Sequence, residues 1–305
     1  MRWRKRGHVF APDGTRPWAR RYAFPPTPHR LDDEVLRVYV ACCDERTVGR
    51  VGYVDVLLED PSTVVRVAPD PVLDIGEPGC FDDNGVVPTM VLPVGDELWL
   101  YYTGYQLGTR VPYFQFLGLA VSTDGGETFE RRSRAPVLDR SDAEPLTRSS
   151  AFVAPLDGRF RMYYAAGAGW TRTDDGRAVP VYDLRVVESD DGVVWPAAGR
   201  TCVTLQGDEH AIGRPWLLPG SDPWRLLYSA RSASRDYRIG VAVSDDGLRW
   251  ERRDGEAGID VSADGWDSAA VAYASVVEHG ERVLMLHCGN ERGATGFGWA
   301  ELESW

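Results

Sequence analysis

The sequence predicts an all-β protein, a five-bladed β-propeller whose ring is closed by the N-terminal strand. Three observations lead to this prediction: a repeated turn motif, a repeated series of strands and a spare strand at the start of the chain. The turn is Ser-x-Asp-Gly with an aromatic residue soon after it, and it begins at Ser122, Ser189 and Ser244, each time after a short apolar strand. Glycine accepts a positive φ and aspartate tolerates it, so the motif is typical of a β-hairpin. Hairpins that recur along a chain indicate a repeated β unit.

The strands between these turns repeat in the same order. The first unit covers residues 21–67, and its clearest strand is Val35–Ala41. The later units begin near four residues: Asp82, Glu144, Glu209 and Trp266. The fifth unit has only three strands before the chain ends, whereas Trp3–Pro12 is a spare strand at the other end. If this strand completes the last unit, the ring closes and no sheet edge stays exposed.

The repeat runs from end to end, so a single domain over residues 1–305 is predicted, with a pair of β-sandwiches as the alternative fold. No long helix is expected. The stretch Trp170–Val179 is rich in Arg, Asp and Gly and is predicted as a long exposed loop. Val194–Trp195 is predicted as the outer strand of the third unit.

Composition and charge narrow the class of partner. The hydrophobic share of 43% allows a sizeable core, and 32 glycines and 20 prolines suit a turn-rich β protein. The formal charge of −12 argues against nucleic acid or an anionic membrane as a partner. We see no signal peptide and no apolar run of transmembrane length, so a cytoplasmic location is expected.

Acidic residues recur just before the first strand of most units. When the units are superposed on their first strands, four residues fall in similar places: Pro88, Ser149, Arg214 and Tyr273. An acid lies about five or six residues before each of them: Asp83, Glu144, Glu209 and Asp267. The innermost strands of a propeller surround a channel, so these carboxylates would converge at one mouth. Their mutual repulsion could raise one pKa, which is one way in which a general acid is made.

Several segments together resemble the glycosidase-type five-bladed propellers, which include arabinanases, β-xylosidases, levansucrases and invertases. The resemblance rests on the succession of five units, on the Ser-x-Asp-Gly turn with its aromatic, and on the segments Leu98–Gly104 and Gly293–Ala300. It covers nearly the whole chain. It implies a glycoside hydrolase-like enzyme that acts on a small sugar or glycoconjugate in a central-channel pocket by carboxylate acid/base catalysis.

The resemblance also implies a trio of carboxylates from successive blades. By position, Asp83 matches the Asp that acts as base or nucleophile, and Glu209 matches the Glu acid. Arg148 matches an arginine of the motif, but Ser149 stands where the supporting Asp would be. This departure puts plain hydrolysis in doubt. Three acids compete for the roles left open: Asp82 with Asp83, and Glu144 or Asp267 for the missing Asp.

Further residues are predicted to bind the substrate. Arg148 and Arg214 could bind hydroxyls or an anionic group and could hold carboxylates ionised. Trp18 and Tyr105 could stack on a sugar face, and Asp267 could also contact substrate. His210, next to Glu209, could act as an acid, a base or a metal ligand. For Asp83, Glu209 and Arg214, turn bonds or ion pairs between blades are the structural alternative.

No cofactor is expected, although a Ca²⁺ ion on the channel axis stays open as an alternative. Two other functions remain beside hydrolysis. The chain could be a propeller recruited to a non-hydrolytic step in small-metabolite biosynthesis, or a non-catalytic carbohydrate-binding propeller. The serine at Ser149 and the lack of a secretion signal both argue against secreted polysaccharide degradation.

Overall fold

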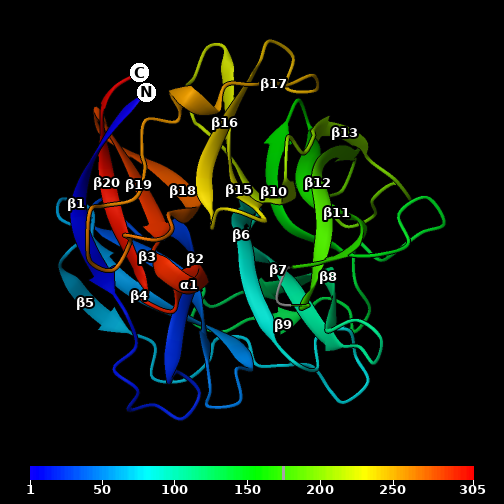
Figure 1. Ribbon diagram of the computed structural model, residues 1–305. Helices are drawn as coiled ribbons and strands as arrows, with labels where there is room; N and C mark the ends of the chain where they lie inside the picture. Colours follow the sequence, from blue (N-terminus) through cyan, green and yellow to red (C-terminus); the bar gives the residue numbers. More distant parts are fainter. Residues whose placement is uncertain (174–175) are drawn as a thin grey trace.

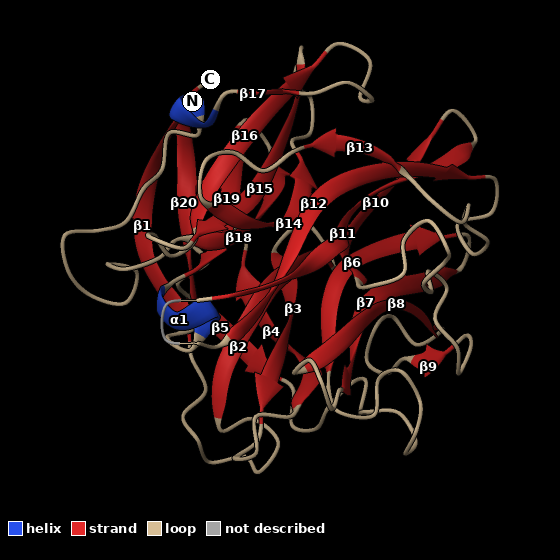
Figure 2. Ribbon diagram, turned by 45° about the vertical axis from the view of Figure 1, so that its right-hand side comes forward, coloured by secondary structure: helices blue, strands red, loops and turns tan. Residues whose placement is uncertain are grey.

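The computed structural model describes residues 1–173 and 176–305, and their regular secondary structure is almost entirely β-strand (Figures 1 and 2). Their only helical elements are a 3₁₀ turn, η1 (Asp254–Glu256), and one short helix, α1 (Asn290–Gly293). The expected lack of a long helix is therefore confirmed for the described part of the chain.

The strands follow one another in antiparallel series of four, which we number as strand groups 1 to 5. Group 1 consists of β2 (Arg21–Arg30), β3 (Val35–Cys43), β4 (Gly49–Leu57) and β5 (Val64–Val67). Group 2 consists of β6 (Val86–Val94), β7 (Glu97–Leu107), β8 (Tyr113–Ser122) and β9 (Glu130–Arg131). Group 3 consists of β10 (Arg148–Leu156), β11 (Arg159–Arg172), β12 (Ala178–Ser189) and β13 (Arg200–Val203). Group 4 consists of β14 (Glu209–Leu217), β15 (Trp224–Ser232), β16 (Arg238–Ser244) and β17 (Glu251–Arg252). Group 5 consists of β18 (Ala272–His279), β19 (Arg282–Cys288), β20 (Phe297–Ser304) and β1 (Arg2–Phe10).

The two ends of the chain meet in group 5. The N-terminal strand β1 pairs antiparallel with β20, from Arg2 opposite Ser304 to Phe10 opposite Phe297, and Figure 1 shows the two termini side by side. The predicted pairing of the first strand with the last unit is therefore observed. Groups 3 and 4 share one eight-stranded sheet through a parallel bridge between Tyr182 and Ala211.

Two stretches differ from the sequence prediction. Val194 and Trp195 belong to the turn, because Asp191 accepts the backbone N–H groups of Val193 and Val194, each at 2.8 Å. The outer strand of group 3 is instead β13. The stretch predicted as a loop, 170–179, is largely hairpin, since β11 continues to Arg172 and β12 starts at Ala178. Residues 174–175 of that stretch lie outside the described residues.

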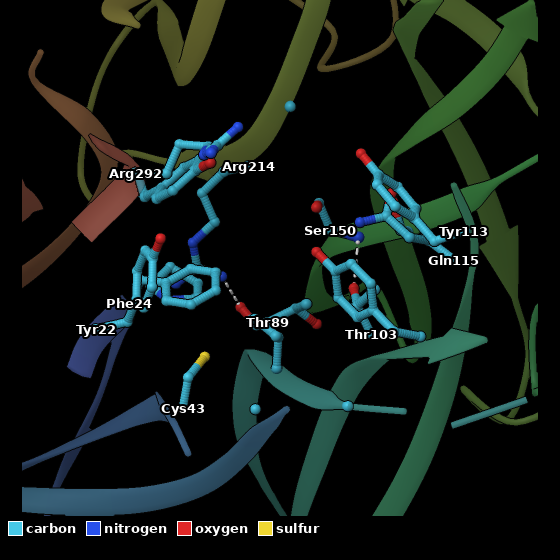
Figure 3. Close-up of a pocket in the computed structure, with 18 of the residues that line it drawn as sticks. Tyr22, Phe24, Cys43, Thr89, Thr103, Tyr113, Gln115, Ser150, Arg214 and Arg292 are labelled. Atoms are coloured by element: carbon cyan, nitrogen blue, oxygen red, sulfur yellow. Dashed lines mark hydrogen bonds between the residues drawn. The ribbon is translucent and has the colours of Figure 1, made fainter. Parts of the chain in front are cut away.

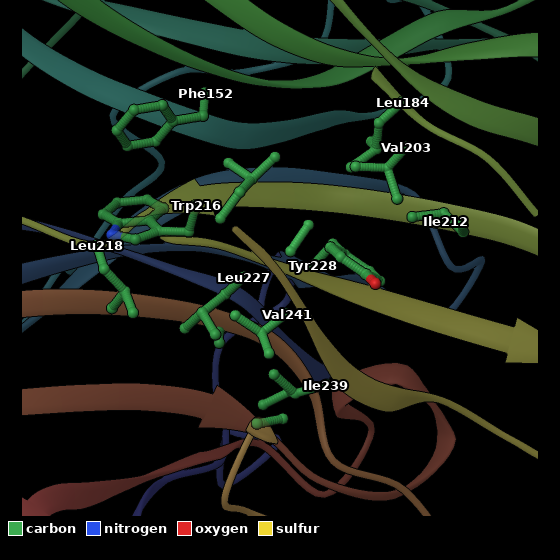
Figure 4. Close-up of a cluster of buried hydrophobic side chains, with 14 of the residues drawn as sticks. Phe152, Leu184, Val203, Ile212, Trp216, Leu218, Leu227, Tyr228, Ile239 and Val241 are labelled. Atoms are coloured by element: carbon green, nitrogen blue, oxygen red, sulfur yellow. The ribbon is translucent and has the colours of Figure 1, made fainter. Parts of the chain in front are cut away.

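Hydrophobic clusters fill the spaces between consecutive groups. One cluster joins groups 3, 4 and 5 around Trp216, with Phe152 and Leu227 among its members (Figure 4). Other clusters join groups 5 and 1, groups 1 and 2, and groups 2 and 3. Burial of apolar surface therefore holds the groups side by side in chain order and also joins the last group to the first.

The Ser-x-Asp-Gly turns add a repeated polar contact between groups. A buried tyrosine of one group donates its hydroxyl to a glycine carbonyl in the turn of the next group. The three pairs are Tyr39–Gly126 at 2.9 Å, Tyr101–Gly192 at 2.6 Å and Tyr163–Gly247 at 2.7 Å. The motif that defines the repeat in the sequence thus links its neighbours in the fold, and it is structural, as predicted.

The first strands of the five groups contact one another in succession: β2 contacts β6, β6 contacts β10, β10 contacts β14, β14 contacts β18, and β18 contacts β2. Each of them has a register shift, between residues 24 and 27, 88 and 90, 149 and 152, 213 and 216, and 272 and 275. A β-bulge of this kind bends a strand and redirects a side chain. Ser150, Arg214 and Tyr273 have positive φ angles of 53°, 53° and 58° at these bulges.

Candidate functional site

A cavity of about 460 Å³ lies where the bulged first strands meet, and we name it the central cavity (Figure 3). All five first strands contribute residues of their bulges to its wall: Phe24, Pro25, Thr89, Ser150, Arg214 and Tyr273. The bulges therefore explain why one small region collects side chains from every group. Such a cavity has the size typical of a small-molecule site.

The rest of the wall comes from the hairpins that join the second and third strands of the groups. These hairpins, and the ends of the strands that they join, supply Arg46, Thr47, Tyr105, Tyr113, Tyr182, Arg231, Tyr237 and Arg292. In a repeated fold, equivalent hairpins lie at the same side of the molecule. Residues more than 200 positions apart, such as Arg46 and Arg292, consequently line one space.

Aromatic rings cover much of one wall. Phe24 lies between Tyr22 and Tyr273, with ring centroids 5.7 Å and 6.3 Å away, and Tyr273 is 5.2 Å from Tyr237. The hydroxyls of Tyr182 and Tyr237 are hydrogen-bonded at 3.0 Å. Burial raises the pKa of Tyr182 and of Tyr273 well above the ordinary value, so both stay protonated at neutral pH.

A second aromatic group lies in the wall made by groups 2 and 3. Tyr113 is 5.6 Å from both Tyr105 and Trp170, measured between ring centroids. Gln115 and Thr103 lie close to this group (Figure 3). The wall therefore offers flat apolar faces together with hydroxyl and amide groups, a combination that suits the apolar faces and hydroxyls of a sugar.

Arg214 lies in the wall of the central cavity and is held by backbone from two other groups. Its guanidinium donates to the carbonyls of Pro26 and Thr89 and to the hydroxyl of Thr27, with distances of 2.9 Å to Pro26 and 3.0 Å to Thr27. No carboxylate pairs with it among the described residues, and its Nε has no partner there either. Burial lowers the pKa of Arg214 to about 9. The side chain joins groups 1, 2 and 4 at the wall of the cavity.

The described residues that line the cavity include four arginines and six tyrosines but neither Asp nor Glu. The arginines are Arg46, Arg214, Arg231 and Arg292. This composition is unusual for a chain with 46 acidic residues and a formal charge of −12. The cavity is consequently a cationic and aromatic region of an acidic protein.

The two predicted catalytic carboxylates are not among the residues that line the cavity. Asp83 is half-buried and accepts the backbone N–H of Gly79 at 2.8 Å. Glu209 forms a two-point ion pair with Arg252, at 2.7 Å and 2.8 Å, and accepts the backbone N–H of Gln206. Both contacts correspond to the structural alternative weighed for these residues. Their catalytic roles stay predictions.

Two of the predicted substrate-binding residues, Arg214 and Tyr105, line the cavity. His210 is one contact away, because its Nε2 accepts a hydrogen bond from Arg231 at 3.3 Å. Burial, followed by the charge of Arg231, lowers the pKa of His210. The ring is therefore largely neutral at neutral pH.

The other three predicted binding residues lie outside the lining. Arg148 is buried against Glu144 at 2.6 Å, and Asp267 is paired with Lys5 at 2.6 Å. Trp18 packs over Gly52 and donates its indole N–H to the carbonyl of Pro69. Each of these three residues has a structural partner that accounts for its position.

The alternative acids are buried in similar networks. Asp82 accepts hydrogen bonds from the Tyr102 hydroxyl at 2.9 Å and from Arg131 at 2.7 Å. Glu144 is bound by Arg148, by Arg185 and by the hydroxyl of Tyr164. Most of the acids that recur in the sequence are thus buried in ion pairs, as Asp82, Glu144, Glu209 and Asp267 are.

Residues that the sequence prediction missed make up most of the cavity, above all Arg231, Arg292, Tyr182 and Tyr237. One signal was available for Arg292, since it lies between Gly289 and Gly293 in a segment that invites unusual backbone angles, and its φ is 61°. For Arg231, Tyr182 and Tyr237, the available signal was their position, because each lies in or beside the hairpin that joins the second and third strands of its group.

Among the described residues, no group of three or more His, Cys, Asp or Glu side chains is arranged to hold a metal ion. In the same part of the chain, no helix has both the length and the apolar character needed to cross a membrane.

Comparisons with known proteins relate the chain to one uncharacterized family and to one fold. No model of a known protein family matches it. The uncharacterized protein Rv1502 of Mycobacterium tuberculosis (strain ATCC 25618 / H37Rv) is 36% identical over 305 residues, which is 100% of both chains. The uncharacterized protein MT1551 of Mycobacterium tuberculosis (strain CDC 1551 / Oshkosh) shows the same identity and coverage.

Solved structures are similar over nearly the whole chain. A glycoside hydrolase superposes with a TM-score of 0.74 at 20% identity, covering 98% of this chain and 90% of the other. A thermostable family-43 glycoside hydrolase gives 0.66 at 15% identity, covering 96% and 91%. A structure from work on the GH130 family of mannoside phosphorylases gives 0.70 at 16% identity, covering 98% and 93%. The fold is therefore that of the propeller-type glycoside hydrolases.

Proposed function

The chain belongs to the family of the uncharacterized protein Rv1502 of Mycobacterium tuberculosis, and on that premise we propose that it is a glycoside hydrolase-like enzyme acting on a small sugar or glycoconjugate in the central cavity. The observation that carries the proposal is the cavity itself, which collects aromatic and hydrogen-bonding side chains from all five strand groups. The fold shared with glycoside hydrolases supports it.

We also propose that the five strand groups are the blades of one propeller domain over residues 1–305, closed by β1. Three observations support this arrangement. The N-terminal strand pairs with β20, the first strands contact one another in succession from group 1 round to group 5 and back, and a hydrophobic cluster joins group 5 to group 1.

Within this proposal, a sugar ring packs on the wall formed by Phe24, Tyr237 and Tyr273, whose rings lie within 6.3 Å of a neighbour. Hydroxyl and amide groups on the opposite wall, such as Thr103 and Gln115, accept or donate hydrogen bonds to sugar hydroxyls. The buried tyrosine hydroxyls stay protonated and act as donors.

Hydrolysis by two carboxylates needs one acid and one base or nucleophile on either side of the glycosidic bond. Asp83 and Glu209 keep these roles as predictions, and Glu209 would have to act while bound to Arg252. A non-hydrolytic or purely binding role is the second candidate, because no described residue of the lining is Asp or Glu.

The test measures turnover and binding with a panel of aryl glycosides and cell-extract metabolites. Thr47 is exposed at the rim of the cavity, so Thr47→Trp obstructs the entrance without disturbing the core. Thr201→Trp places the same side chain at an exposed site on β13 and is the matched control. We expect turnover or binding of a panel member to be lost in the first variant and kept in the second.

The other outcomes separate the candidates. Unchanged turnover in both Asp83→Asn and Glu209→Gln contradicts the carboxylate assignment. Binding without turnover in the wild type selects the second candidate. Binding that is equally strong in the wild type and in Thr47→Trp places the ligand elsewhere and overturns the proposal.

A further inference from the structure

We propose that the ligand of the central cavity carries a phosphoryl group, and that Arg231 and Arg292 bind it from two sides. The inference rests on the proposed function, in which this cavity holds a sugar, and it adds the chemical class of that sugar. Four features carry the inference: the free donors of both arginines, their shared place in the wall of one cavity, the lack of carboxylates in that wall, and the size of the cavity.

Arg231 lies near the end of β15 and lines the cavity beside an aromatic ring. Its guanidinium carbon is 5.1 Å from the centre of the Tyr237 ring, and its Nε donates to His210 at 3.3 Å. Within the described part of the chain, its two terminal nitrogens donate to no protein acceptor. One edge of the guanidinium is therefore oriented by the protein, while the remaining donors are free for a ligand.

Arg292 approaches the cavity from group 5, in the segment between β19 and β20 (Figure 3). Its backbone is in the left-handed region, with φ 61°, and so is that of Glu291, with φ 50°. Non-glycine residues adopt this conformation at a cost, and it recurs at functional sites. Among the described residues, the guanidinium of Arg292 has no ion pair and no hydrogen bond.

Arg231 and Arg292 both line the central cavity, as do Tyr237 and Tyr273, and the guanidinium of Arg231 lies over the Tyr237 ring. The acid nearest in sequence to Arg231 is Asp236, which is exposed and accepts the backbone N–H of Tyr237 at 2.8 Å. No carboxylate of the described residues lies within 4.0 Å of either guanidinium.

Outside the cavity, the protein pairs its fully buried arginines with acids, as it does for Arg37 with Asp55 and for Arg148 with Glu144. Arg231 is half-buried and Arg292 is exposed, and two cations that line one cavity repel each other unless an anion binds between them. An anionic ligand would supply the charge that the protein leaves out.

A phosphoryl group matches these donors better than a carboxylate does. A phosphate monoester carries a charge of about −1.5 to −2 at pH 7 and offers three acceptor oxygens. This charge is close in magnitude, and opposite in sign, to the charge of two guanidinium groups. Each guanidinium can bind two of these oxygens in its planar fork. The cavity volume of about 460 Å³ leaves room for a sugar attached to the phosphoryl group.

The experiment is an isothermal titration of the full-length protein with four probes: inorganic phosphate, glucose 1-phosphate, glucuronate and glucose. The test variants are Arg231→Gln and Arg292→Gln, which keep a polar side chain of similar length. Arg249→Gln removes an exposed arginine charge from an outer turn, away from the cavity, and is the control. Circular dichroism and thermal melting confirm that each variant folds.

We expect saturable binding of inorganic phosphate to the wild type, weakened about tenfold or more by either cavity substitution and unchanged by the control. Binding should weaken as salt rises. Absence of saturable phosphate binding, or binding insensitive to both cavity substitutions, overturns the inference. Glucuronate that binds as tightly as glucose 1-phosphate overturns the phosphoryl assignment. One outcome separates the inference from the proposed function. If Thr47→Trp abolishes binding of a neutral glycoside and both arginine variants bind that glycoside as the wild type does, the inference is refuted and the proposed function stands.

Discussion

Glu144 shows how the acids that recur in the sequence are used in the fold. It is buried in group 3, where Arg148 lies at 2.6 Å and Arg185 at 2.9 Å, and it also accepts the hydroxyl of Tyr164 and the backbone N–H of Gly199. A buried carboxylate with two arginine partners holds the sheet together and has no lone pair left for a substrate.

We expect Glu144→Gln to lower the free energy of unfolding by about 3–5 kcal/mol, because it leaves two arginines without their counterion. Asp190→Asn, which removes an acid whose side chain is 87% exposed, should change it by less than about 0.5 kcal/mol. Urea denaturation measures both values. A Glu144→Gln protein as stable as the wild type would contradict a structural role and reopen a functional one.

His287 is a buried histidine that resists protonation in the folded state. Its ring stacks on Trp266 with centroids 5.1 Å apart, and its Nε2 has no partner among the described residues. Burial, followed by the charge of Lys5, lowers the pKa of His287 to about 4. The unfolded chain binds a proton near pH 6.5, where the folded chain does not.

The folded protein should therefore lose stability as the pH falls from 6.5 toward 4, because only the unfolded state gains the proton of His287 in that range. The contribution at pH 4.5 is about 2–3 kcal/mol relative to pH 7. His29 and His210, whose pKa values burial also lowers, add to the same trend. Urea denaturation at pH 7 and pH 4.5 gives the loss in free energy of unfolding between the two pH values. This loss should be smaller in His287→Leu than in the wild type by about 2–3 kcal/mol, and an equal loss in both proteins would refute the assignment.

At this scale, the sequence predicted the positions of the acids but not their partners. Arg185 and Arg252 lie 41 and 43 residues after the acids that they bind, so only the fold brings them together. For that reason, the spacing that suggested converging carboxylates could not distinguish a catalytic mouth from a set of buried ion pairs.

At the scale of elements, the bulges in the first strands decide where the cavity forms. Most strands were predictable from apolar runs and turn residues, as in β3 and β7. The bulges were not, because a register shift depends on the pairing of two strands and leaves no fixed residue pattern. The sequence did align Ser149, Arg214 and Tyr273 as equivalent positions, and the structure places all three in the wall of the cavity.

Ser150 tests the bulge geometry, since its φ of 53° is a conformation that disfavours β-branched side chains. Ser150→Val should be less stable than Ser150→Gly by about 1–2 kcal/mol in urea denaturation. The backbone N–H of Ser150 donates a hydrogen bond to the Thr103 hydroxyl at 3.0 Å, and both variants keep this N–H. Equal stability of the two variants would mean that the backbone is not left-handed at this position.

At the scale of the whole molecule, the first strand joins the two ends of the chain. β1 buries Trp3 and Val9, and it covers the edge of β20. An uncovered edge strand offers unpaired backbone groups to other chains. The sequence predicted this pairing from a simple count, because one unit lacked a strand and the other end of the chain had one to spare.

Removal of residues 1–10 should lower the melting temperature by about 10 °C or more and promote aggregation, because it takes away a buried tryptophan and one side of the sheet. Removal of Trp305, which is 52% exposed, is the control and should have little effect. Calorimetry and light scattering measure the two properties. A truncated protein that melts like the wild type would contradict the proposed closure by β1.

Charge is also distributed at the scale of the whole molecule. A protein with a formal charge of −12 keeps four arginines and no described Asp or Glu around its central cavity. Composition alone could not reveal the cationic cavity, because it reports only the net charge of the chain, which is negative. The cavity of an acidic protein can therefore select an anion.

The most direct test of the central claim is a crystal structure with glucose 1-phosphate, at a concentration near its dissociation constant from the titration. The account predicts the phosphoryl group between Arg231 and Arg292 and the sugar ring against the wall of Phe24, Tyr237 and Tyr273. An empty central cavity, with the ligand bound to any other part of the surface, would contradict it.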